Sequence, residues 1–269
     1  MKKRDFLAGA GGSLAAGALG ALAPGLARAA GPWQPEELAE GTVDSATLEA
    51  LPGKAPLIKR SYRPTNYETP IDYLRTAFAG GVYAHGRTSS VLELANENNA
   101  VLAMTGDYYG IHDRGVVIRN GELYREGTFE DVLVLNYDGS MATYTAEAFD
   151  IEAVKAGGAW QAWSFGPMLL DDGQPMSEFN SDVPSLNPRS AIGCFEPGHY
   201  CFVLVDGRQE GYSVGMTLAQ LSQLFYDLGC VTAYNLDGGQ SAVLTFMGQV
   251  VNQPYRDGRP VSDIVYIGE

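Results

Sequence analysis

Downstream of about residue 75, short apolar runs alternate with turn signals, a pattern typical of a β-rich domain. Asn120-Gly121 and Asp138-Gly139 each separate two strand-like runs and predict tight hairpins, and a third hairpin crosses Met247-Gly248. Apolar runs at 101–104 and 201–205 predict buried strands, and we expect the second to be central in its sheet. The remaining strand-like runs are 116–119, 122–125, 132–137, 141–144, 160–170, 190–194, 243–246 and 249–251.

A few helices are expected between these strands. Capping-box patterns start two of them and predict helices over 90–98 and 217–228. Shorter helices are predicted at 150–155 and, nearer the N-terminus, at 43–51. Together these elements predict an α+β fold, in which a mixed, largely antiparallel sheet carries a few packed helices in a single domain.

The N-terminal residues 1–29 have the features of an export signal. A basic start at 2–4 precedes an apolar run at 6–26 and the cleavage-type sequence Ala27-Arg28-Ala29, and the Lys-Arg pair resembles a twin-arginine signal, with a Sec signal as the alternative. We therefore expect a periplasmic or extracellular mature protein. Residues 30–74, rich in Pro, Glu and Ala, are predicted to be an N-terminal extension or linker. No later run is long and apolar enough to predict a stable membrane span.

The formal net charge is −14, and loss of residues 1–29 would remove four basic residues and one acidic residue, giving −17. Such an acidic chain disfavours nucleic acid as a partner. Of the three cysteines, Cys194 and Cys201 end the arms of a predicted hairpin and are candidates for a disulfide, which would leave Cys230 over. The alternative is three small buried side chains without a disulfide.

The sequence Asn235-Leu236-Asp237-Gly238-Gly239-Gln240-Ser241 is the strongest candidate for a site. It lies between two apolar runs, and its paired glycines let the backbone turn sharply and a ligand approach closely. An amide, a carboxylate and a hydroxyl are costly at the ends of buried strands unless they bind a ligand or close a hydrogen-bond network. A tight turn whose Asp accepts backbone N–H groups is the simpler alternative.

Three other loops carry candidate residues. Asp107 lies in Met104-Thr105-Gly106-Asp107-Tyr108-Tyr109-Gly110 at the end of a buried strand, and Arg189 offers a planar fork that suits phosphate or a surface carboxylate. Asp206 follows the apolar run 201–205 and would either shape a solvated turn or join Asp107 and Asp237 in a carboxylate cluster. Such a cluster would raise a carboxyl pKa or hold a divalent cation, Ca²⁺ or Mg²⁺, with Asp206 as a metal ligand.

These segments, in this order, resemble the phosphodiester glycosidase domain family over roughly residues 75–269. The family carries Asn-Leu-Asp-Gly-Gly-Gly-Ser-Ser, from which this chain departs at Gln240 and Ala242, and Thr105 stands where the family has Asn. The matching segments also include Asn187-Pro188-Arg189-Ser190-Ala191-Ile192-Gly193, Val205-Asp206-Gly207-Arg208 and Val261-Ser262-Asp263-Ile264-Val265-Tyr266.

The resemblance implies an exported hydrolase that cleaves a sugar-1-phosphodiester, of a glycan or cell-envelope polysaccharide, into free sugar and a phosphomonoester. It implies Asp237 and Asp107 as catalytic carboxylates. The substrate- or phosphate-binding residues would be Arg189, Asn235, Gly238, Gly239, Ser241, Thr105, Gly106 and Tyr108. Two alternatives stay open from the sequence: a non-catalytic module that binds glycan or exopolysaccharide, and a metal-dependent phosphodiesterase that cleaves the P–O bond.

Overall fold

The computed structural model describes residues 47–49, 57–59, 67–68 and 71–268. The predicted export segment 1–29 and most of the predicted extension 30–74 lie outside these residues. Three short antiparallel strands, β1 (Thr47–Glu49), β2 (Leu57–Lys59) and β3 (Tyr67–Glu68), form a small sheet. The helix predicted over 43–51 is wrong at 47–49, because these residues pair with β2 as a strand.

One antiparallel sheet of five strands has the order β17-β16-β5-β18-β4. The helix α1 (Val91–Glu97) packs against it through Val91, Leu94 and Ala95, and Ser90 and Glu93 close the predicted capping box at its start. In this sheet the register sets Ile264 opposite Thr105, so that the end of β5 lies beside the start of β18. The strands are β4 (Leu74–Phe78), β5 (Leu102–Thr105), β16 (Leu244–Phe246), β17 (Gln249–Val250) and β18 (Asp263–Ile267).

A second antiparallel sheet has the order β7-β6-β10-β8-β9 and carries the helix α2 (Ile151–Ala156), capped by Asp150. Both predicted hairpins are present, the first across Asn120-Gly121, where both residues have positive φ as a tight turn requires. The strand predicted over 160–170 stops at Trp163 and resumes only at Leu170. The strands are β6 (Val117–Arg119), β7 (Glu122–Arg125), β8 (Val132–Asn136), β9 (Met141–Tyr144) and β10 (Ala159–Trp163).

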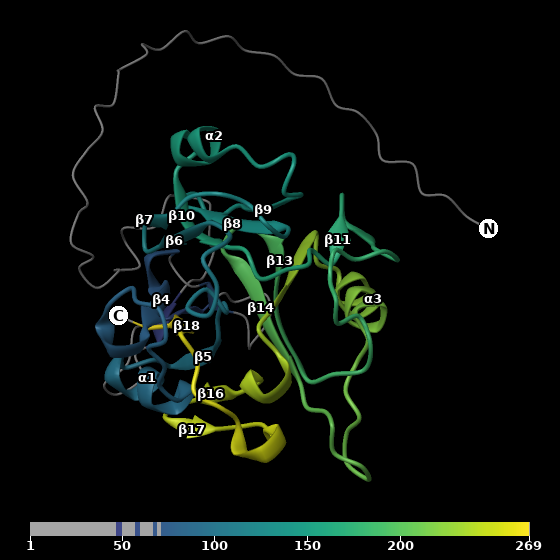
Figure 1. Cartoon of the computed structure of the whole chain (residues 1–269). Coiled ribbons are helices and arrows are strands. Elements are labelled where there is room, and N and C mark those ends of the chain that lie inside the picture. The colour runs from purple at the N-terminus through teal and green to yellow at the C-terminus, as the bar shows by residue number, and fades with distance from the viewer. Residues whose placement is uncertain (1–46, 50–56, 60–66, 69–70, 269) are drawn as a thin grey trace, which may run out of the picture. The chain divides into compact units, whose positions relative to one another are not determined.

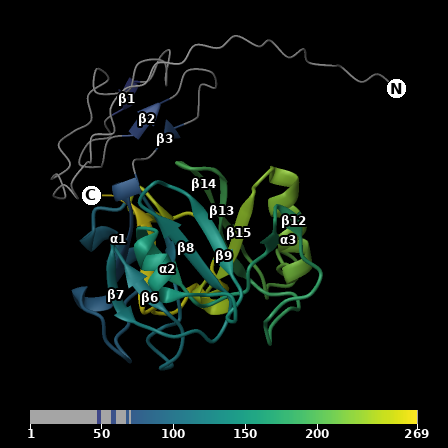
Figure 2. The same ribbon diagram turned by 90° about the horizontal axis from the view of Figure 1, so that it is seen from above.

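The third sheet has the order β14-β13-β15 and consists of β13 (Arg189–Glu196), β14 (His199–Val205) and β15 (Thr232–Leu236). The helix α3 (Leu218–Leu228) covers one face of this sheet with Leu218, Leu221 and Phe225, next to the short strands β11 (Leu170–Asp171) and β12 (Gln174–Pro175) (Figure 2). Contrary to the prediction for 201–205, β14 is an edge strand and is only half-buried, because β13 lies between it and β15.

One hydrophobic core unites the three larger sheets. It contains Leu74 and Met104 from the first sheet, Leu133 and Trp163 from the second, and Ile192 from the third, all fully buried. Figure 1 shows β13 and β14 in the middle of the molecule, with α3 on one side and β5 and β18 on the other. The predicted α+β fold, largely antiparallel with a few packed helices, is confirmed.

The candidate disulfide between Cys194 and Cys201 does not form, and the three cysteines are unpaired, as in the alternative interpretation. In the β13–β14 ladder Cys194 lies opposite Tyr200 and Cys201 lies opposite Gly193, so the two thiols point to opposite faces of the sheet. The sulfur of Cys201 lies 3.6 Å from that of Cys230 instead, beneath α3.

Within the described residues, no helix has the length and apolar character needed to cross a bilayer.

Candidate active site

Antiparallel register brings the predicted site segments to one edge of the molecule. The start of β13 lies beside the ends of both its neighbours, because Arg189 pairs with Val205 and Ser190 pairs with Leu236. The loop after β15 reaches the loop after β5 through a hydrogen bond in which the Asp237 N–H donates to the Gly106 carbonyl over 3.1 Å. Loops distant in sequence thus meet around a cleft of about 560 Å³.

The loop after β15 needs both of its glycines. A side chain at Gly238 would place its Cβ 2.6 Å from the Pro188 carbonyl oxygen, and Gly239 has a φ of 61° and lies against the Arg208 guanidinium. The Gly239 N–H donates to the same Pro188 carbonyl over 2.9 Å, which fixes the turn against the segment before β13. Close backbone packing and positive φ therefore explain the glycine pair.

Asp237 is the carboxylate that this turn presents to the cleft. It is 6% exposed, and Arg259 donates to it from Nη2 over 3.1 Å while its Nε donates to the Ser241 hydroxyl oxygen over 2.5 Å. Burial raises the pKa of Asp237, whereas Ser241 and Arg259 oppose that rise by favouring the charged form. The Arg259 guanidinium also lies 4.9 Å from the ring centre of Tyr108, so one arginine orders three predicted site residues.

Asp107, the second predicted catalytic carboxylate, is 2% exposed and is not among the residues that line the cleft. Its Oδ2 accepts from the Ser164 N–H over 3.1 Å and from Arg119 Nη2 over 3.4 Å. Arg119 also donates from Nε to Asp263 over 2.8 Å, and Asp263 accepts the Asp107 N–H over 2.8 Å. Asp107, Arg119 and Asp263 thus form a buried ion cluster, which we call the inner cluster, and Asp107 Oδ1 has no hydrogen-bond partner among the described residues.

Gly106 and Thr105 belong to the surroundings of the inner cluster. A Cβ at Gly106 would lie 2.5 Å from Asp263 Oδ1, so glycine is required for this carboxylate to approach. Thr105 is fully buried and its hydroxyl has no hydrogen-bond partner in the described structure. Neither residue lines the cleft, and the same holds for Ser241.

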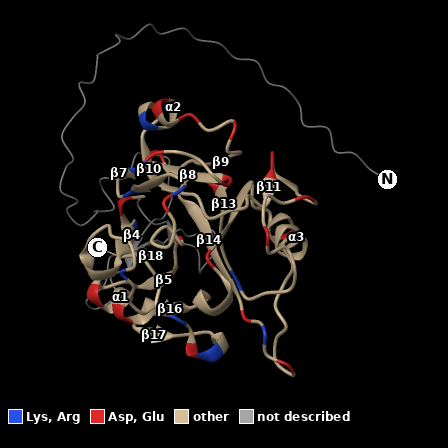
Figure 3. Cartoon of the chain, in the orientation of Figure 1, with Lys and Arg blue, Asp and Glu red and all other residues tan. Residues whose placement is uncertain are grey.

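Two arginines of the cleft wall have no carboxylate partner among the described residues. Arg189 is 5% exposed, and its Nε and Nη2 donate to the backbone carbonyls of Met216, Val183 and Ser185. Arg208 donates from Nε and Nη2 to Asn187 Oδ1. Burial, reinforced by the neighbouring Arg208, lowers the pKa of Arg189 to about 10. The chain has 32 acidic and 18 basic residues, and Figure 3 colours the charged positions of its described part. In so acidic a chain, two cleft-wall arginines without a carboxylate partner among the described residues are candidates to bind an anion.

Two more polar groups line the cleft without protein partners. Asn235 donates from Nδ2 to the Gly166 carbonyl over 2.8 Å, which leaves its buried Oδ1 without a hydrogen bond among the described residues. Glu130 has a buried Oε2 with no partner in the same set, and burial together with Asp131 and Asp182 raises its pKa. An unpaired buried acceptor is costly, so both groups are suited to bind a polar ligand in the cleft.

Asp206, the predicted metal ligand, does not line the cleft. Its Oδ2 accepts from the Tyr212 hydroxyl and the Gln253 N–H, both over 2.9 Å, and its Oδ1 accepts from Asn252 Nδ2 over 2.7 Å. In the part of the chain that the structure describes, no three His, Cys, Asp or Glu side chains are grouped to hold a metal ion. The predicted cluster of Asp107, Asp206 and Asp237 is therefore not formed, because Asp206 organises a separate turn.

Comparison with known proteins decides the family. The family model described as phosphodiester glycosidase matches residues 98–268, more than half of the chain. The chain belongs to the phosphodiester glycosidase family. Among curated proteins it is similar to the SPbeta prophage-derived uncharacterized protein YomE of Bacillus subtilis (strain 168), with 27% identity over 222 residues. That match covers 78% of this chain and 33% of YomE, so the chain spans about a third of this relative's length.

Three solved structures share the fold. The catalytic domain of zebrafish N-acetylglucosamine-1-phosphodiester alpha-N-acetylglucosaminidase, auto-inhibited by its pro-peptide, matches with a TM-score of 0.62 at 20% identity, over 86% of this chain and 85% of that chain. A hypothetical protein from Synechocystis has a TM-score of 0.51 at 17% identity, over 82% of this chain and 61% of its own. A putative exported protein from Burkholderia pseudomallei K96243 has a TM-score of 0.51 at 14% identity, and the match covers 73% of this chain and 71% of that chain. At these identities the likenesses show the fold alone.

In this member of the phosphodiester glycosidase family, the cleft contains one of the two predicted catalytic carboxylates, Asp237. It also contains five of the predicted substrate-binding residues, which are Tyr108, Arg189, Asn235, Gly238 and Gly239. Sequence reasoning did not select Arg208, Arg259 or Glu130 as site residues. Arg208 lies inside a segment that supported the resemblance, and Arg259 lies two residues before another, so closer inspection of those segments would have found them. Glu130 has no local sequence signal.

The inner cluster should make the free energy of unfolding depend on pH. Burial raises the pKa of Asp263 to about 6 despite the Arg119 guanidinium. Because the folded protein holds this proton more tightly than the unfolded chain does, the stabilisation is complete below about pH 4 and is lost as the pH rises through about 6. Asp263→Asn should therefore show a smaller decrease in unfolding free energy between pH 5 and pH 7 than the wild type, measured by urea denaturation.

Asp138→Asn is the matched control for this experiment. Hydrogen bonds from Ser140 lower the pKa of the exposed Asp138, so its removal should not reduce the decrease between pH 5 and pH 7. Equal pH dependence in Asp263→Asn and the wild type would contradict the assignment of a raised pKa to Asp263.

Proposed function

We propose that this protein is an exported hydrolase that cleaves a sugar-1-phosphodiester at the anomeric carbon, releasing free sugar and a phosphomonoester. The carrying observation is the unneutralised pair Arg189 and Arg208, which shares a cleft with the buried carboxylate of Asp237. Membership of the phosphodiester glycosidase family supports the reaction class. The signal-like residues 1–29 support a periplasmic or extracellular location.

The arginines fit the phosphodiester group. Arg189 and Arg208 each use Nε and Nη2 to bind protein oxygens, so the Nη1 groups are the donors left for a ligand within the described structure. The intramolecular bonds hold both guanidinium groups in place before substrate arrives, which lowers the entropic cost of binding. Positive charge at this position stabilises the negative charge that develops on the leaving phosphate.

Asn235 and Tyr108 lie in the same cleft as the arginines and suit the sugar. The free Oδ1 of Asn235 accepts a hydrogen bond from a sugar hydroxyl, and the Tyr108 ring offers an apolar face. We place the anomeric carbon between these groups and Asp237. The departures from the family sequence at Thr105 and Ala242 are compatible with this arrangement, because neither residue lines the cleft, whereas the departure at Gln240 places a side-chain amide in the cleft wall.

Three carboxylates line the cleft, those of Glu130, Asp182 and Asp237, and we assign Asp237 and Glu130 to this bond. Glycoside cleavage passes through an oxocarbenium-like state and normally employs two carboxylates. Asp237, paired with Arg259, acts as the charged carboxylate facing the anomeric carbon. Glu130, with its raised pKa, carries the proton that the departing phosphate oxygen takes up. The C–O bond breaks with its electron pair on the phosphate oxygen. Water supplies the oxygen of the new hydroxyl on the sugar, and the proton that this water loses restores the proton that Glu130 gave up.

The site of bond cleavage can be read from isotope labelling. In heavy-oxygen water, the label should appear in the free sugar and not in the phosphomonoester, as measured by mass spectrometry of both products.

Asp237→Asn preserves the shape of the side chain but removes its charge, so turnover should fall by about 10²- to 10⁴-fold. Label in the phosphate would establish a phosphodiesterase instead. Absence of turnover in the wild type, with retained glycan binding, would support the binding-module alternative.

The pH profile of kcat/KM tests the two carboxylate roles. Activity should decrease at low pH as Asp237 is protonated, at a pH above the usual range for Asp because burial raises its pKa. It should decrease again at higher pH as Glu130 loses its proton. Glu130→Gln should lower the activity and abolish the decrease on the alkaline side. Asp182→Asn, on the same cleft wall, should retain that decrease but move it to lower pH, because Asp182 helps to raise the pKa of Glu130. A Glu130→Gln enzyme with the wild-type profile would contradict the role given to Glu130.

A further inference from the structure

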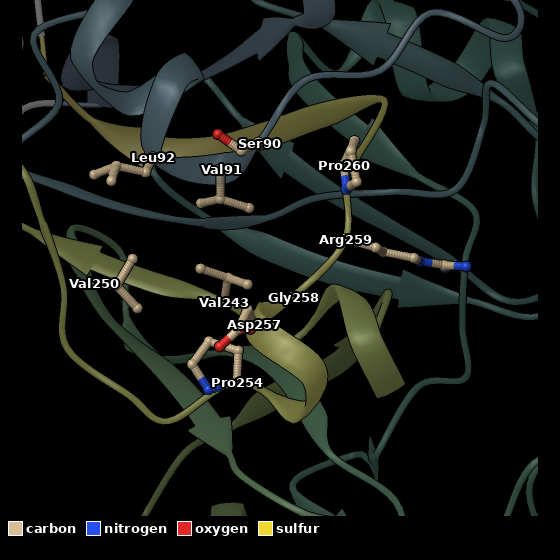
Figure 4. A pocket seen from close by; sticks show the side chains of 10 residues that line it. All are labelled: Ser90, Val91, Leu92, Val243, Val250, Pro254, Asp257, Gly258, Arg259 and Pro260. Carbon is tan, nitrogen blue, oxygen red and sulfur yellow. The ribbon is translucent and has the colours of Figure 1, made fainter.

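A second cavity, of about 380 Å³, lies beside the candidate active site (Figure 4). Its lining is predominantly apolar and comes from the start of α1, from the residue before β16, from β17 and from the segment before β18. The apolar side chains are Val91, Leu92, Val243, Val250, Pro254 and Pro260, and one carboxylate, that of Asp257, also lines the cavity. The hydroxyl of Ser90 also lines it but is engaged in the capping box with Glu93. We call this cavity the apolar groove.

Arg259 joins the apolar groove to the cleft, since it lines both. Figure 4 shows its side chain leading away from the apolar side chains, and its guanidinium reaches Asp237 and Ser241. The wall between the two cavities is thin, because Gln240, which lines the cleft, donates from Nε2 to the carbonyl of Gly258, which lines the groove, over 2.9 Å. A molecule that contacts Arg259 or Gln240 in the cleft therefore lies next to residues that line the apolar groove.

Gly258 keeps the groove open next to this wall. Its φ is 81°, and a Cβ there would lie 2.8 Å from Val243 Cγ2 and 3.8 Å from Pro254 Cβ. A side chain at this position would therefore fill the part of the groove closest to Arg259. The volume of the groove lies in the range of roughly 300–1,000 Å³ that is usual for small-molecule pockets.

We propose that the apolar groove binds the alcohol-derived group of the phosphodiester, and that this group is an aliphatic chain. The inference rests on the proposed function, in which the sugar and phosphate occupy the cleft. A phosphodiester carries a second ester group, and a ligand with an anionic phosphate and an apolar chain complements a site with unneutralised arginines beside an apolar groove. A sugar-1-phosphate ester of a long-chain alcohol has this chemistry.

The test compares methyl, butyl and octyl esters of one sugar-1-phosphate as substrates of the full chain. Each methylene that enters the groove should raise kcat/KM by up to about fourfold, mainly through KM. Val250→Asp introduces a charge at a groove residue that is 39% exposed, and should reduce the octyl-to-methyl ratio of kcat/KM at least tenfold. Val251→Asp, at the neighbouring residue, which is 53% exposed and does not line the groove, should leave the ratio unchanged.

The outcomes separate this inference from the proposed function. Hydrolysis of all three esters at one rate, or an unchanged ratio in Val250→Asp, would overturn the groove assignment and leave the proposed function standing. Hydrolysis of none would overturn the proposed function, and calorimetry with octyl phosphate and methyl phosphate then decides the groove. Tighter binding of octyl phosphate that is lost in Val250→Asp supports the assignment, and equal binding of the two phosphates overturns it.

Discussion

The geometry of the site depends on the ion pairs that the Arg119 guanidinium forms with Asp107 and Asp263. Arg119 lies on β6 of the second sheet, is 1% exposed, and binds Asp263 at the start of β18 and Asp107 in the loop after β5, both in the first sheet. Removing one member of such a buried ion group typically costs about 3–5 kcal/mol, because a charge is left without a partner. The inner cluster therefore fixes the loop after β5, whose Gly106 carbonyl holds the Asp237 N–H.

The charged groups of the site fall into two layers with different tasks. The inner cluster is closed to the cleft, and its charges are used to join two sheets. The outer layer faces the cleft and contains Arg189 and Arg208, neither of which has a carboxylate partner among the described residues. Under the proposed function, these local cations, and not the net charge of the chain, hold the anionic substrate.

Features set by neighbouring residues could be predicted from the sequence, and features set by tertiary contacts could not. The capping boxes of α1 and α3 and the hairpin at Asn120-Gly121 depend on residues within one turn, and all are present. The order of strands is a long-range property, so an apolar run at 201–205 indicated burial but gave no means of placing β14 at an edge. In the same way Asp107 and Asp237 look alike in the sequence, and only the approach of Arg119, about 12 residues further along the chain, assigns Asp107 to the inner cluster.

The central claim is that the unneutralised arginines hold the phosphate while Asp237 faces the anomeric carbon. A crystal structure of the protein with a non-hydrolysable sugar-1-phosphonate ester tests it most directly. The account predicts phosphonate oxygens within hydrogen-bond distance of Arg189 and Arg208, and the anomeric carbon next to the Asp237 carboxylate. A phosphonate bound away from both arginines, or a sugar bound with its anomeric carbon turned away from Asp237, would contradict it.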